Sequence, residues 1–254
     1  MADGLDLPVA ATQTSTDIIE TLADLDGAGV TAIAETLERS KSSVHDHLQT
    51  LTALGFVVKH GYEYRVGPRF LRLGSAAQRQ YPIYTAGVGE VTQLVTASGC
   101  AAGLAIIEGD SVLSVHHRLG PDTETPTVAV GDTLPLHCTA AGKAILAALP
   151  DDRQAELLAA HDFDAGTDEA HADRTALETE LRTVQARGIA VDREEWRPDQ
   201  RGMAATVTDV DGGVCGAVYL RTDTERMSGK RFQQDLPGLV ISSANGIRNS
   251  LRDA

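Results

Sequence analysis

The stretch from Thr31 to Val66 constrains the fold of this chain more than any other part of the sequence. It begins with apolar residues at helical spacing, and Val44, Leu48 and Leu51 continue that spacing in a second helix. After Gly55, which is expected to end the second helix, alternating apolar and polar residues predict two short strands joined by a turn. This order of elements predicts a winged helix-turn-helix, a module that reads DNA. A small helical bundle with a hairpin is the alternative.

The second helix of this stretch has hydrogen-bonding side chains opposite its apolar stripe, as expected for a helix in the major groove of double-stranded DNA. Ser40 or Ser42 is expected to cap the helix, which would leave backbone amides free for a phosphate. We expect base contacts from Ser43, His47 and their neighbours, and phosphate contacts from Lys41 and the basic residues of the wing. The predicted DNA-binding set is Lys41, Ser42, Ser43, His45, His47, Gln49, Thr50, Lys59 and Arg65.

Length and composition are those of a globular protein with room for two modest cores. The chain has 254 residues, 42% of them hydrophobic, and no apolar run long enough to cross a membrane. The N-terminus lacks a basic region and a long apolar segment, so we expect no secretory signal. Cys100, Cys138 and Cys215 lie far apart without a CxxC pattern. This indicates free thiols in a reducing cytoplasm, with one intermolecular disulfide as the alternative.

The net charge of −14 is distributed unevenly along the chain. Between Glu38 and Arg72 there are six basic residues and three acidic ones, whereas the C-terminal part is strongly acidic. Asp outnumbers Glu and lysine is scarce, which is typical of proteins from a salty cytoplasm. On this compositional ground we expect a halophilic archaeal source. DNA binding would then depend less on counterion release and more on hydrogen bonds, shape and burial.

From Cys100 onward the pattern changes to strands mixed with helices. The expected strands are residues 101–107, 111–116, 127–130, 189–191, 203–210 and 214–220. The expected helices are residues 139–149, 151–160, 173–187 and 236–251. Asp211-Gly212 is a strong hairpin turn between the last two strands. The sum is an antiparallel sheet flanked by helices, so the fold class is α+β.

Further helices are expected before this sheet. Residues 1–11 are expected to form a loose tail, and Thr14-Ser15-Thr16-Asp17 to cap the first helix. A helix from Pro68 to about Arg79 would connect the domains, and the next one, from about Ile83 to Ala97, would pack on the second core. The predicted domains are therefore residues 1–78, the winged helix-turn-helix with the start of the linker helix, and residues 79–254.

The segment from Leu134 to Lys143 predicts an anion site by its own chemistry. Thr139-Ala140-Ala141-Gly142 begin a helix with side chains too small to cover its first amides. These amides and the positive end of the helix dipole are expected to face an open space. The alternative is close packing of a small-residue helix against the sheet. The segment is not a GxxxxGK phosphate loop, because His137 stands at the first glycine position.

Four segments carry a resemblance to a known family: SKSSVHDHLQTLTALGF, YRVGPRFLRLG, LPLHCTAAGKAILAALP and RGIAVDREE. Together they resemble the IclR family, the isocitrate lyase regulator type of bacterial and archaeal transcription factor. The resemblance extends over nearly the whole chain, with the motifs in the family's order. It implies an N-terminal winged helix-turn-helix, a linker helix and a C-terminal GAF-like effector-binding domain. It also implies a homodimer or homotetramer that binds a palindromic operator and responds to a small-molecule effector.

Carried over position by position, the resemblance implies a set of effector contacts. Asp192 would accept a hydrogen bond from the effector or hold the loop after Val191. Tyr219 and Arg221 lie two apart on one strand and therefore on one face. They replace serines found in some relatives, so they would shrink the pocket or clamp a carboxylate, with an exposed strand-end charge as the alternative for Arg221. The predicted set is Leu134, Ala140, Ala141, Asp192, Gly202, Tyr219 and Arg221, and the expected effector is a small organic or sugar-derived acid.

The chain departs from the family pattern at several of these positions. Gly202 stands where some members have cysteine, so no side chain can form a hydrogen bond there. Many relatives have arginine where this chain has Asp46, and a glycine in the turn where it has Arg39-Ser40. Asp46 could accept from cytosine N4, or orient His45 or His47.

Two other classes of protein use residues of the kinds found in the C-terminal half. An enzyme could combine His116, His117 or His137 with Cys138 or Cys215, and a metal sensor could add the acidic loop from Asp162 to His171. No GxSxG, HExxH or paired-carboxylate motif supports an enzyme, and the His and Cys spacings match no standard zinc pattern. We therefore expect no catalytic activity, cofactor or metal, and keep a metal-responsive regulator as the alternative.

Overall fold

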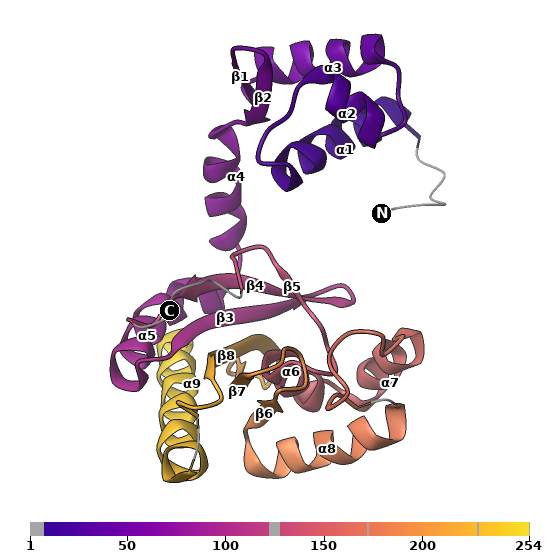
Figure 1. Cartoon of the computed structure of the whole chain (residues 1–254). Helices are drawn as coiled ribbons and strands as arrows, with labels where there is room; N and C mark the ends of the chain where they lie inside the picture. Colours follow the sequence, from indigo (N-terminus) through magenta and orange to yellow (C-terminus); the bar gives the residue numbers. More distant parts are fainter. Residues whose placement is uncertain (1–7, 122–127, 172, 228, 254) are drawn as a thin grey trace. The chain divides into compact units, whose positions relative to one another are not determined.

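The computed structural model describes residues 8–121, 128–171, 173–227 and 229–253 (Figure 1). Its internal contacts divide the chain into two compact units, one that extends to Ala77 and one that begins at Gln78. No helix in these described ranges is long and apolar enough to cross a membrane.

The first unit is a helix-turn-helix followed by a two-stranded antiparallel ribbon. Its elements are α1 (Ala10–Asp24), α2 (Val30–Thr36), α3 (Lys41–Ala53), β1 (Val57–His60), β2 (Glu63–Val66) and α4 (Arg69–Gln78), which leads into the second unit. Val44 and Leu48 of α3 are fully buried against Ile18 and Leu22 of α1 and Ile33 of α2. The spacing of these apolar residues therefore produces one core, and it leaves the opposite face of α3 exposed.

Ser40 is the N-cap of α3, because its side chain accepts a hydrogen bond from the backbone N–H of Ser43 at 3.2 Å. We expect Ser40→Ala to lower the free energy of unfolding of the first unit by about 1 kcal/mol, because that amide loses its partner. Ser42→Ala is the matched control, since Ser42 is exposed and does not cap the helix. Thermal unfolding of both variants measures the difference, and equal losses would contradict the cap assignment.

The first helix begins earlier than predicted. It starts at Ala10, after an N-cap residue, Val9, whose side chain makes no capping hydrogen bond. The hydroxyls expected to cap the helix point along it: Thr14 donates to the carbonyl of Ala10, and Thr16 to that of Thr12. Threonine inside a helix can satisfy its hydroxyl in this way, so the run of threonine and serine continues the helix instead of starting it.

The second unit is built around an antiparallel sheet. Its helices are α5 (Pro82–Ser98), α6 (Ala140–Ala148), α7 (Asp151–Ala160), α8 (Arg174–Arg187) and α9 (Leu236–Arg252), the last preceded by a π-helical turn (Arg231–Asp235). Its strands are β3 (Ala101–Glu108), β4 (Ser111–Arg118), β5 (Thr133–Leu134), β6 (Ala190–Arg193), β7 (Gln200–Thr208) and β8 (Val214–Asp223). They lie in the order β5-β4-β3-β8-β7-β6. The α+β class and the antiparallel sheet are confirmed.

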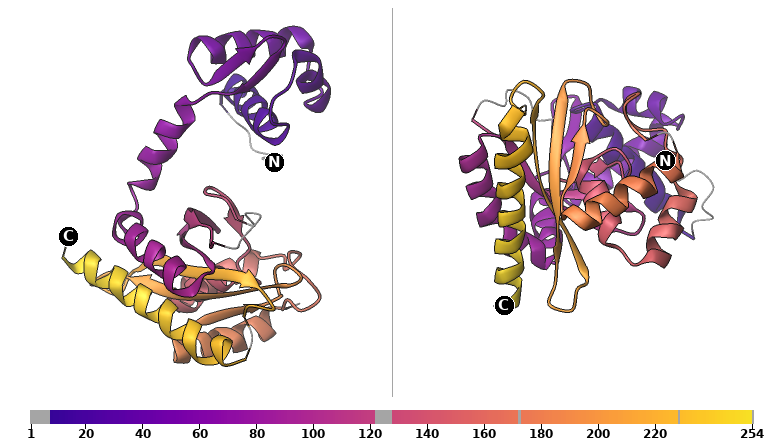
Figure 2. Two further views of the ribbon diagram at one scale, coloured as in Figure 1. Left: turned by 60° about the vertical axis from the view of Figure 1, so that its left-hand side comes forward. Right: turned by 90° about the horizontal axis from the view of Figure 1, so that it is seen from below.

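Helices cover both faces of this sheet, α5 and α9 on one side and α6 with α8 on the other (Figure 2). Alternate residues of a strand face opposite layers. Leu104 and Ile106 of β3 pack with α5 and α9, whereas Ala105 of β3 and Ala217 of β8 join the cluster that contains α6. The small side chains on the second face allow α6 to approach the sheet closely, which places the start of α6 beside the strands.

One predicted strand is wrong. Residues 128–130 of the expected strand 127–130 are not in a strand, and Thr127 lies outside the described residues. The short strand of this region is β5, whose Leu134 pairs with Val112 of β4. Just before β5, the chain turns at Gly131, which has a φ of 96°. The alternating pattern before this turn therefore belongs to a loop, and pairing begins only after it.

Candidate DNA-binding surface and effector pocket

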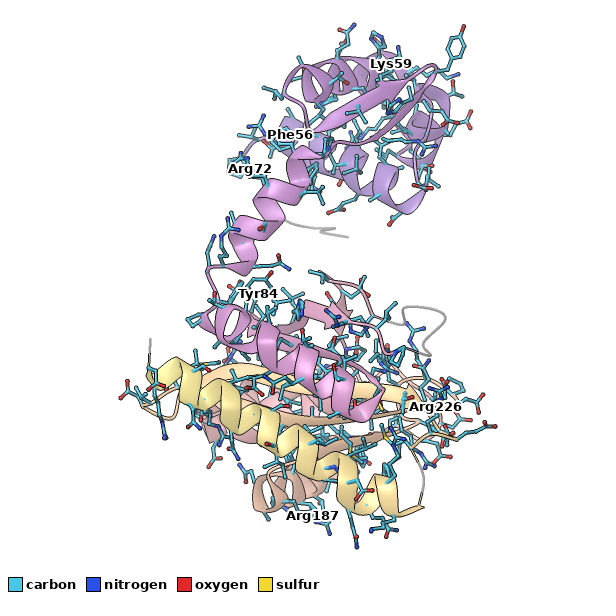
Figure 3. The ribbon with its side chains drawn as sticks, turned by 90° about the vertical axis from the view of Figure 1, so that its left-hand side faces the viewer. Phe56, Lys59, Arg72, Tyr84, Arg187 and Arg226 are labelled. Carbon is cyan, nitrogen blue, oxygen red and sulfur yellow. The ribbon has the colours of Figure 1, made fainter. Side chains whose placement is uncertain are left out.

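The predicted DNA-binding residues lie on the free face of α3 and on the β1–β2 ribbon. Exposed side chains among them are Lys41, Ser42, His45, Gln49, Thr50, Lys59 and Arg65, whereas Ser43 and His47 are half-buried. Figure 3 shows Lys59 at the ribbon. The ammonium of Lys59 lies 5.1 Å from the ring centre of Tyr64. A guanidinium nitrogen of Arg65 lies 3.5 Å from a carboxylate oxygen of Glu63. Both side chains are exposed, and each contacts a neighbour within the ribbon.

His47 is more constrained than the sequence suggested. Its Nδ1 lies 2.8 Å from the Ser15 hydroxyl of α1, so only Nε2 remains for a contact outside the unit. Asp46, which is exposed, lies 3.9 Å from Nδ1 of His45. Of the two histidines that Asp46 could orient, the structure places it beside His45.

One exposed aromatic side chain of this unit was not among the predicted DNA-binding residues. Tyr62 lies in the turn between β1 and β2, beside Gly61, and is 94% exposed. An aromatic side chain so exposed has no packing role in the isolated unit. The alternation of Tyr62 to Val66 predicts that Tyr62 begins the second strand of the ribbon, whereas in the structure this strand begins at Glu63.

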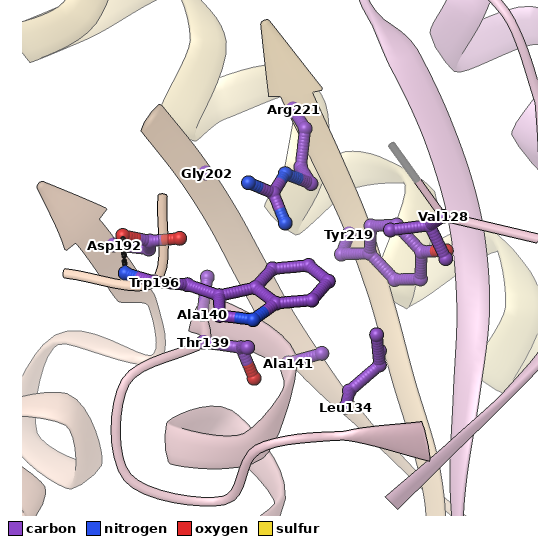
Figure 4. A pocket seen from close by; sticks show the side chains of 10 residues that line it. All are labelled: Val128, Leu134, Thr139, Ala140, Ala141, Asp192, Trp196, Gly202, Tyr219 and Arg221. Carbon is purple, nitrogen blue, oxygen red and sulfur yellow. Dashed lines mark hydrogen bonds between the residues drawn. The ribbon is translucent and has the colours of Figure 1, made fainter. Parts of the chain in front are cut away.

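In the second unit, the predicted effector residues converge on one pocket (Figure 4). All seven line it, together with three that were not predicted: Leu134, Ala140, Ala141, Asp192, Gly202, Tyr219 and Arg221, with Val128, Thr139 and Trp196. These side chains leave almost no space among them for a molecule larger than water. The pocket is therefore nearly filled by its own walls.

The start of α6 forms the floor of this pocket. Thr139 caps the helix by accepting from the N–H of Gly142 at 3.0 Å, whereas the amides of Ala140 and Ala141 have no partner among the described residues. The expected open space is wrong, because side chains fill it. The rest of α6 fits the close-packing alternative, since its residues to Ala147 are buried and the Thr206 hydroxyl of β7 donates to the carbonyl of Ala144 at 2.6 Å.

Arg221 is a buried cation in the pocket wall, so the exposed strand-end alternative is wrong. It is 6% exposed, one of its terminal nitrogens donates to Oε1 of Gln200 at 2.8 Å, and its buried Nε has no partner. Burial lowers the pKa of Arg221 to about 10, although the nearby carboxylate of Asp192 acts in the opposite direction. The guanidinium lies 4.2 Å from the ring centre of Trp196. A positive charge with an unused donor therefore faces the pocket.

Asp192 is fully buried and holds the loop that follows β6. Its Oδ1 accepts from the backbone N–H of Glu195 at 2.9 Å and of Trp196 at 3.4 Å. Burial raises the pKa of Asp192, while the charges of Arg221 and Lys143 lower it. Of the two roles predicted for Asp192, these contacts fit the loop-holding one.

Tyr219 fills one side of the pocket with its ring. Its hydroxyl lies 3.1 Å from the Ser114 hydroxyl and 3.1 Å from Nδ1 of His117, both on β4. Burial raises the pKa of Tyr219 to about 12, so the phenol stays neutral. The hydrogen bonds fix the ring against the sheet, and the large side chain narrows the pocket as the sequence indicated.

Next to the pocket, Lys143 of α6 lies in an ionic cluster with buried Glu195 and half-buried Glu180 and His171. Its ammonium is fully buried and donates to Glu195 Oε1 at 2.6 Å and Oε2 at 2.5 Å, and to Glu180 Oε1 at 2.9 Å. His171 bonds to the other oxygen of Glu180. His171, Glu180 and Glu195 are close enough to hold a metal ion, but the lysine already supplies the positive charge between the carboxylates.

The residues named for an enzyme are not arranged as a nucleophile and base. Burial, together with Asp192 and Glu195, raises the pKa of the Cys138 thiol to about 12, which keeps it protonated. Burial raises the pKa of Cys215 as well. All three cysteines are free thiols. His137 bonds to His161 and to the carbonyl of Ala165, so its ring is used in packing the loop.

A helix-turn-helix unit joined to an α+β unit with a small charged pocket is the construction of a ligand-responsive transcriptional regulator. The family model for the IclR helix-turn-helix domain matches residues 15–61, and that for the bacterial transcriptional regulator IclR C-terminal domain matches residues 76–249. The chain therefore belongs to the IclR family of transcriptional regulators.

Individual relatives agree with this assignment. The transcriptional regulator BhcR of Paracoccus denitrificans is 31% identical over 242 residues, which cover 94% of this chain and 86% of BhcR. A regulator structure from Rhodococcus sp. RHA1 superposes with a TM-score of 0.87 at 23% identity, over 96% of this chain and 99% of the other. An IclR homologue from Microbacterium hydrocarbonoxydans, in complex with 4-hydroxybenzoate, has a TM-score of 0.82 at 18% identity, over 96% of this chain and 100% of the other.

Proposed function

We propose that this chain is a cytoplasmic regulator that binds a palindromic operator as a homodimer or homotetramer, and that a small organic acid in the pocket of the second unit changes its operator affinity. The observation that carries the proposal is the convergence of the α6 amides, buried Arg221 and Tyr219 on one pocket. A carboxylate there would accept hydrogen bonds from the amides of Ala140 and Ala141 and from the guanidinium.

The chemistry of the pocket favours an organic acid over the other effector classes. The homologue from Microbacterium hydrocarbonoxydans binds such an acid, 4-hydroxybenzoate. The metal-responsive alternative has less support, because the ammonium of Lys143 already lies between the carboxylates of Glu180 and Glu195, where a metal ion would lie. An enzyme also has less support, because the raised pKa values of Cys138 and Cys215 keep both thiols protonated, whereas a nucleophile must be a thiolate.

We expect the basic residues of the first unit to contact phosphates and the polar residues of α3 to read bases. Lys41→Ala and Arg65→Ala should weaken binding to all sequences alike and reduce the salt dependence, because phosphates carry no sequence information. Ser43→Ala, and His47→Ala through its free Nε2, should change sequence preference. Selection of bound fragments from a random DNA pool, followed by titrations at several salt concentrations, measures both effects.

The matched control for the charge changes is Arg187→Ala, an exposed arginine at the end of α8 in the second unit (Figure 3). It removes the same charge, so it should leave operator affinity and sequence preference unchanged. A uniform loss of affinity for all four α3 and wing variants would show that Ser43 and His47 do not read bases. Failure to select any DNA would contradict the regulator itself.

Binding of the effector should depend on Arg221. We expect calorimetry of the full-length protein against a panel of small organic acids, 4-hydroxybenzoate among them, to identify a ligand. Arg221→Met should weaken its binding by about tenfold or more, because a charge-assisted hydrogen bond contributes about 1.5–3 kcal/mol. Arg187→Met is the control. Equal affinity of the Arg221 variant and the parent would contradict the clamp, and no binding by any acid would contradict the effector class.

A further inference from the structure

Trp196 lies where a ligand of this pocket would lie. It is the only tryptophan of the chain. It lies in the loop between β6 and β7, and its indole extends across the pocket below Arg221 and above Ala140 and Ala141 (Figure 4). The ring packs against the hydrophobic cluster that includes Ala140 and Ala141 and against the guanidinium of Arg221, so it lies beside the two groups that an acidic effector would use.

Two cations hold the indole in this position. The guanidinium carbons of Arg221 and Arg197 lie 4.2 Å and 4.7 Å from the ring centre. Arg197 also lowers the pKa of Arg221, an effect of like charges in proximity. The indole offers both arginines the face of an aromatic ring, but it cannot accept the hydrogen bond that the buried Nε of Arg221 lacks. A carboxylate could supply that acceptor.

The backbone around Trp196 is fixed independently of its ring. Asp192 binds the amides of Glu195 and Trp196, and the Glu195 carboxylate lies on Lys143. The hydroxyl of Thr167 donates to the carbonyl of Glu194 at 2.6 Å. Glu194 has a φ of 70°, in the left-handed region that a glutamate occupies only when its surroundings hold it there. These contacts hold the backbone at Trp196 without using its indole.

We propose that Trp196 is an internal ligand of the effector pocket: the indole occupies the effector's place, and the effector binds by displacing it from Arg221. This inference rests on the proposed function, because it concerns the same pocket. It accounts for a pocket whose own side chains leave almost no room for a ligand. Because sites for small molecules enclose a cavity, the departure of the indole would supply space that the pocket now lacks.

The test is chemical rescue with free indole as the probe. Trp196→Ala in the full-length protein leaves a cavity with the shape of an indole, lined by alanines, Tyr219 and Arg221. We expect this variant to bind indole, with a rise in its thermal midpoint, because the free ring regains the contacts of the missing side chain with the guanidinium and the apolar wall. The parent should bind at least tenfold more weakly. Trp196→Phe is the matched control, since it keeps most of the cavity filled.

A second measurement uses the parent protein and needs no folded variant. Because Trp196 is the only tryptophan, its emission reports this one site. We expect acrylamide to quench it several-fold less efficiently than free N-acetyltryptophanamide, and Arg221→Met to raise the quenching. Quenching of the parent as efficient as that of the free amide would overturn the inference, as would equal indole binding by the parent and the alanine variant.

The regulatory part is tested on the operator. With DNA fragments selected by the parent, we expect Trp196→Ala to differ in affinity from the parent by about threefold or more, and indole to return it to the parent value. Indole that binds the variant without changing its operator affinity would overturn the role of the ring in regulation. If no fragment is selected, the proposed function fails, while indole binding still decides whether Trp196 occupies the pocket.

Discussion

Replacement of Lys143 with methionine is expected to lower the free energy of unfolding of the second unit by about 3–5 kcal/mol near neutral pH. Methionine fills the same space but leaves Glu195, which is 5% exposed, without the ammonium that now contacts both its oxygens. A buried charge that loses its partner costs more than the pair contributed, because its desolvation is no longer offset. Urea unfolding followed by Trp196 fluorescence measures the loss.

The loss should be smaller in acid, and the sign follows from the pKa of Glu195. Burial already raises that pKa, and Lys143 is the first group that opposes the rise. Without Lys143 the pKa of Glu195 in the folded state rises further above its unfolded value. As pH falls, Glu195 therefore takes up a proton at a higher pH in the folded protein than in the unfolded chain. As pH falls through the raised pKa, Glu195 becomes neutral and the penalty disappears.

Two further variants separate the buried charge from lost packing. The double variant Lys143→Met with Glu195→Gln should recover part of the loss, because neither residue is then charged. Lys230→Met, at an exposed position, should change stability by about 0.5 kcal/mol or less. A double variant no more stable than Lys143→Met, or a loss independent of pH, would contradict the account.

The sequence predicted elements whose local signals agree with their packing. In α3, the apolar spacing of Val44 and Leu48 coincides with Ser40 as a cap and with Gly55, which has a φ of 75°, beyond its end. Helix α7 has the predicted bounds, because Pro150 precedes it and acidic residues occupy its first turn. Where the capping residue, the spacing of apolar residues and the residue that ends the helix all agree in this way, tertiary contacts rarely move the bounds of the helix.

Features that depend on distant contacts were not predictable from pattern. Lys143 was assigned to an anion site, yet its partners Glu180 and Glu195 lie 37 and 52 residues away in the sequence. Trp196 escaped notice because it lies in a loop without periodicity. A lone tryptophan within the charged run DREEWRPDQR was the available signal, since a large aromatic residue in such a run usually contacts something.

The residues of the pocket came from the family resemblance, not from spacing. Asp192, Gly202 and Arg221 lie on different strands, and only the pairing of β6 with β7 and of β7 with β8 brings them together. No periodic pattern relates three strands. Tyr219 and Arg221 were the exception, because two residues on one strand share a face by geometry alone. That they bind an effector stays a prediction.

Acidification from about pH 6.5 to about pH 4 is expected to destabilise the second unit through His117, by about 2 kcal/mol after allowance for its partial exposure. Burial lowers the pKa of His117 to about 4, and the charges of Arg221 and His116 add to this, while Asp132 opposes them. Its ring stacks on Tyr219, and its Nε2 is buried without a partner. Protonation would place a second cation beside Arg221.

The sign follows from the difference between the two states. Above about pH 6.5 His117 is neutral in both, so it makes no pH-dependent contribution. Between that pH and the folded-state pKa of about 4, the unfolded chain binds a proton that the folded unit does not, and stability falls as pH falls. Below about pH 4 both states are protonated and the loss is complete. Asp192 and Glu195, whose pKa values are raised, act in the opposite direction at the acid end.

Comparison of variants isolates this one histidine, because the carboxylates contribute equally to all of them. His117→Asn keeps a polar atom near the Tyr219 hydroxyl and removes the titration, so its unfolding free energy should vary less between about pH 7 and pH 5 than that of the parent. His60→Asn, at an exposed position in the ribbon, should follow the parent. If His117→Asn retained the full pH dependence, the acid sensitivity would belong to His116, His137 or His161, whose pKa values burial also lowers.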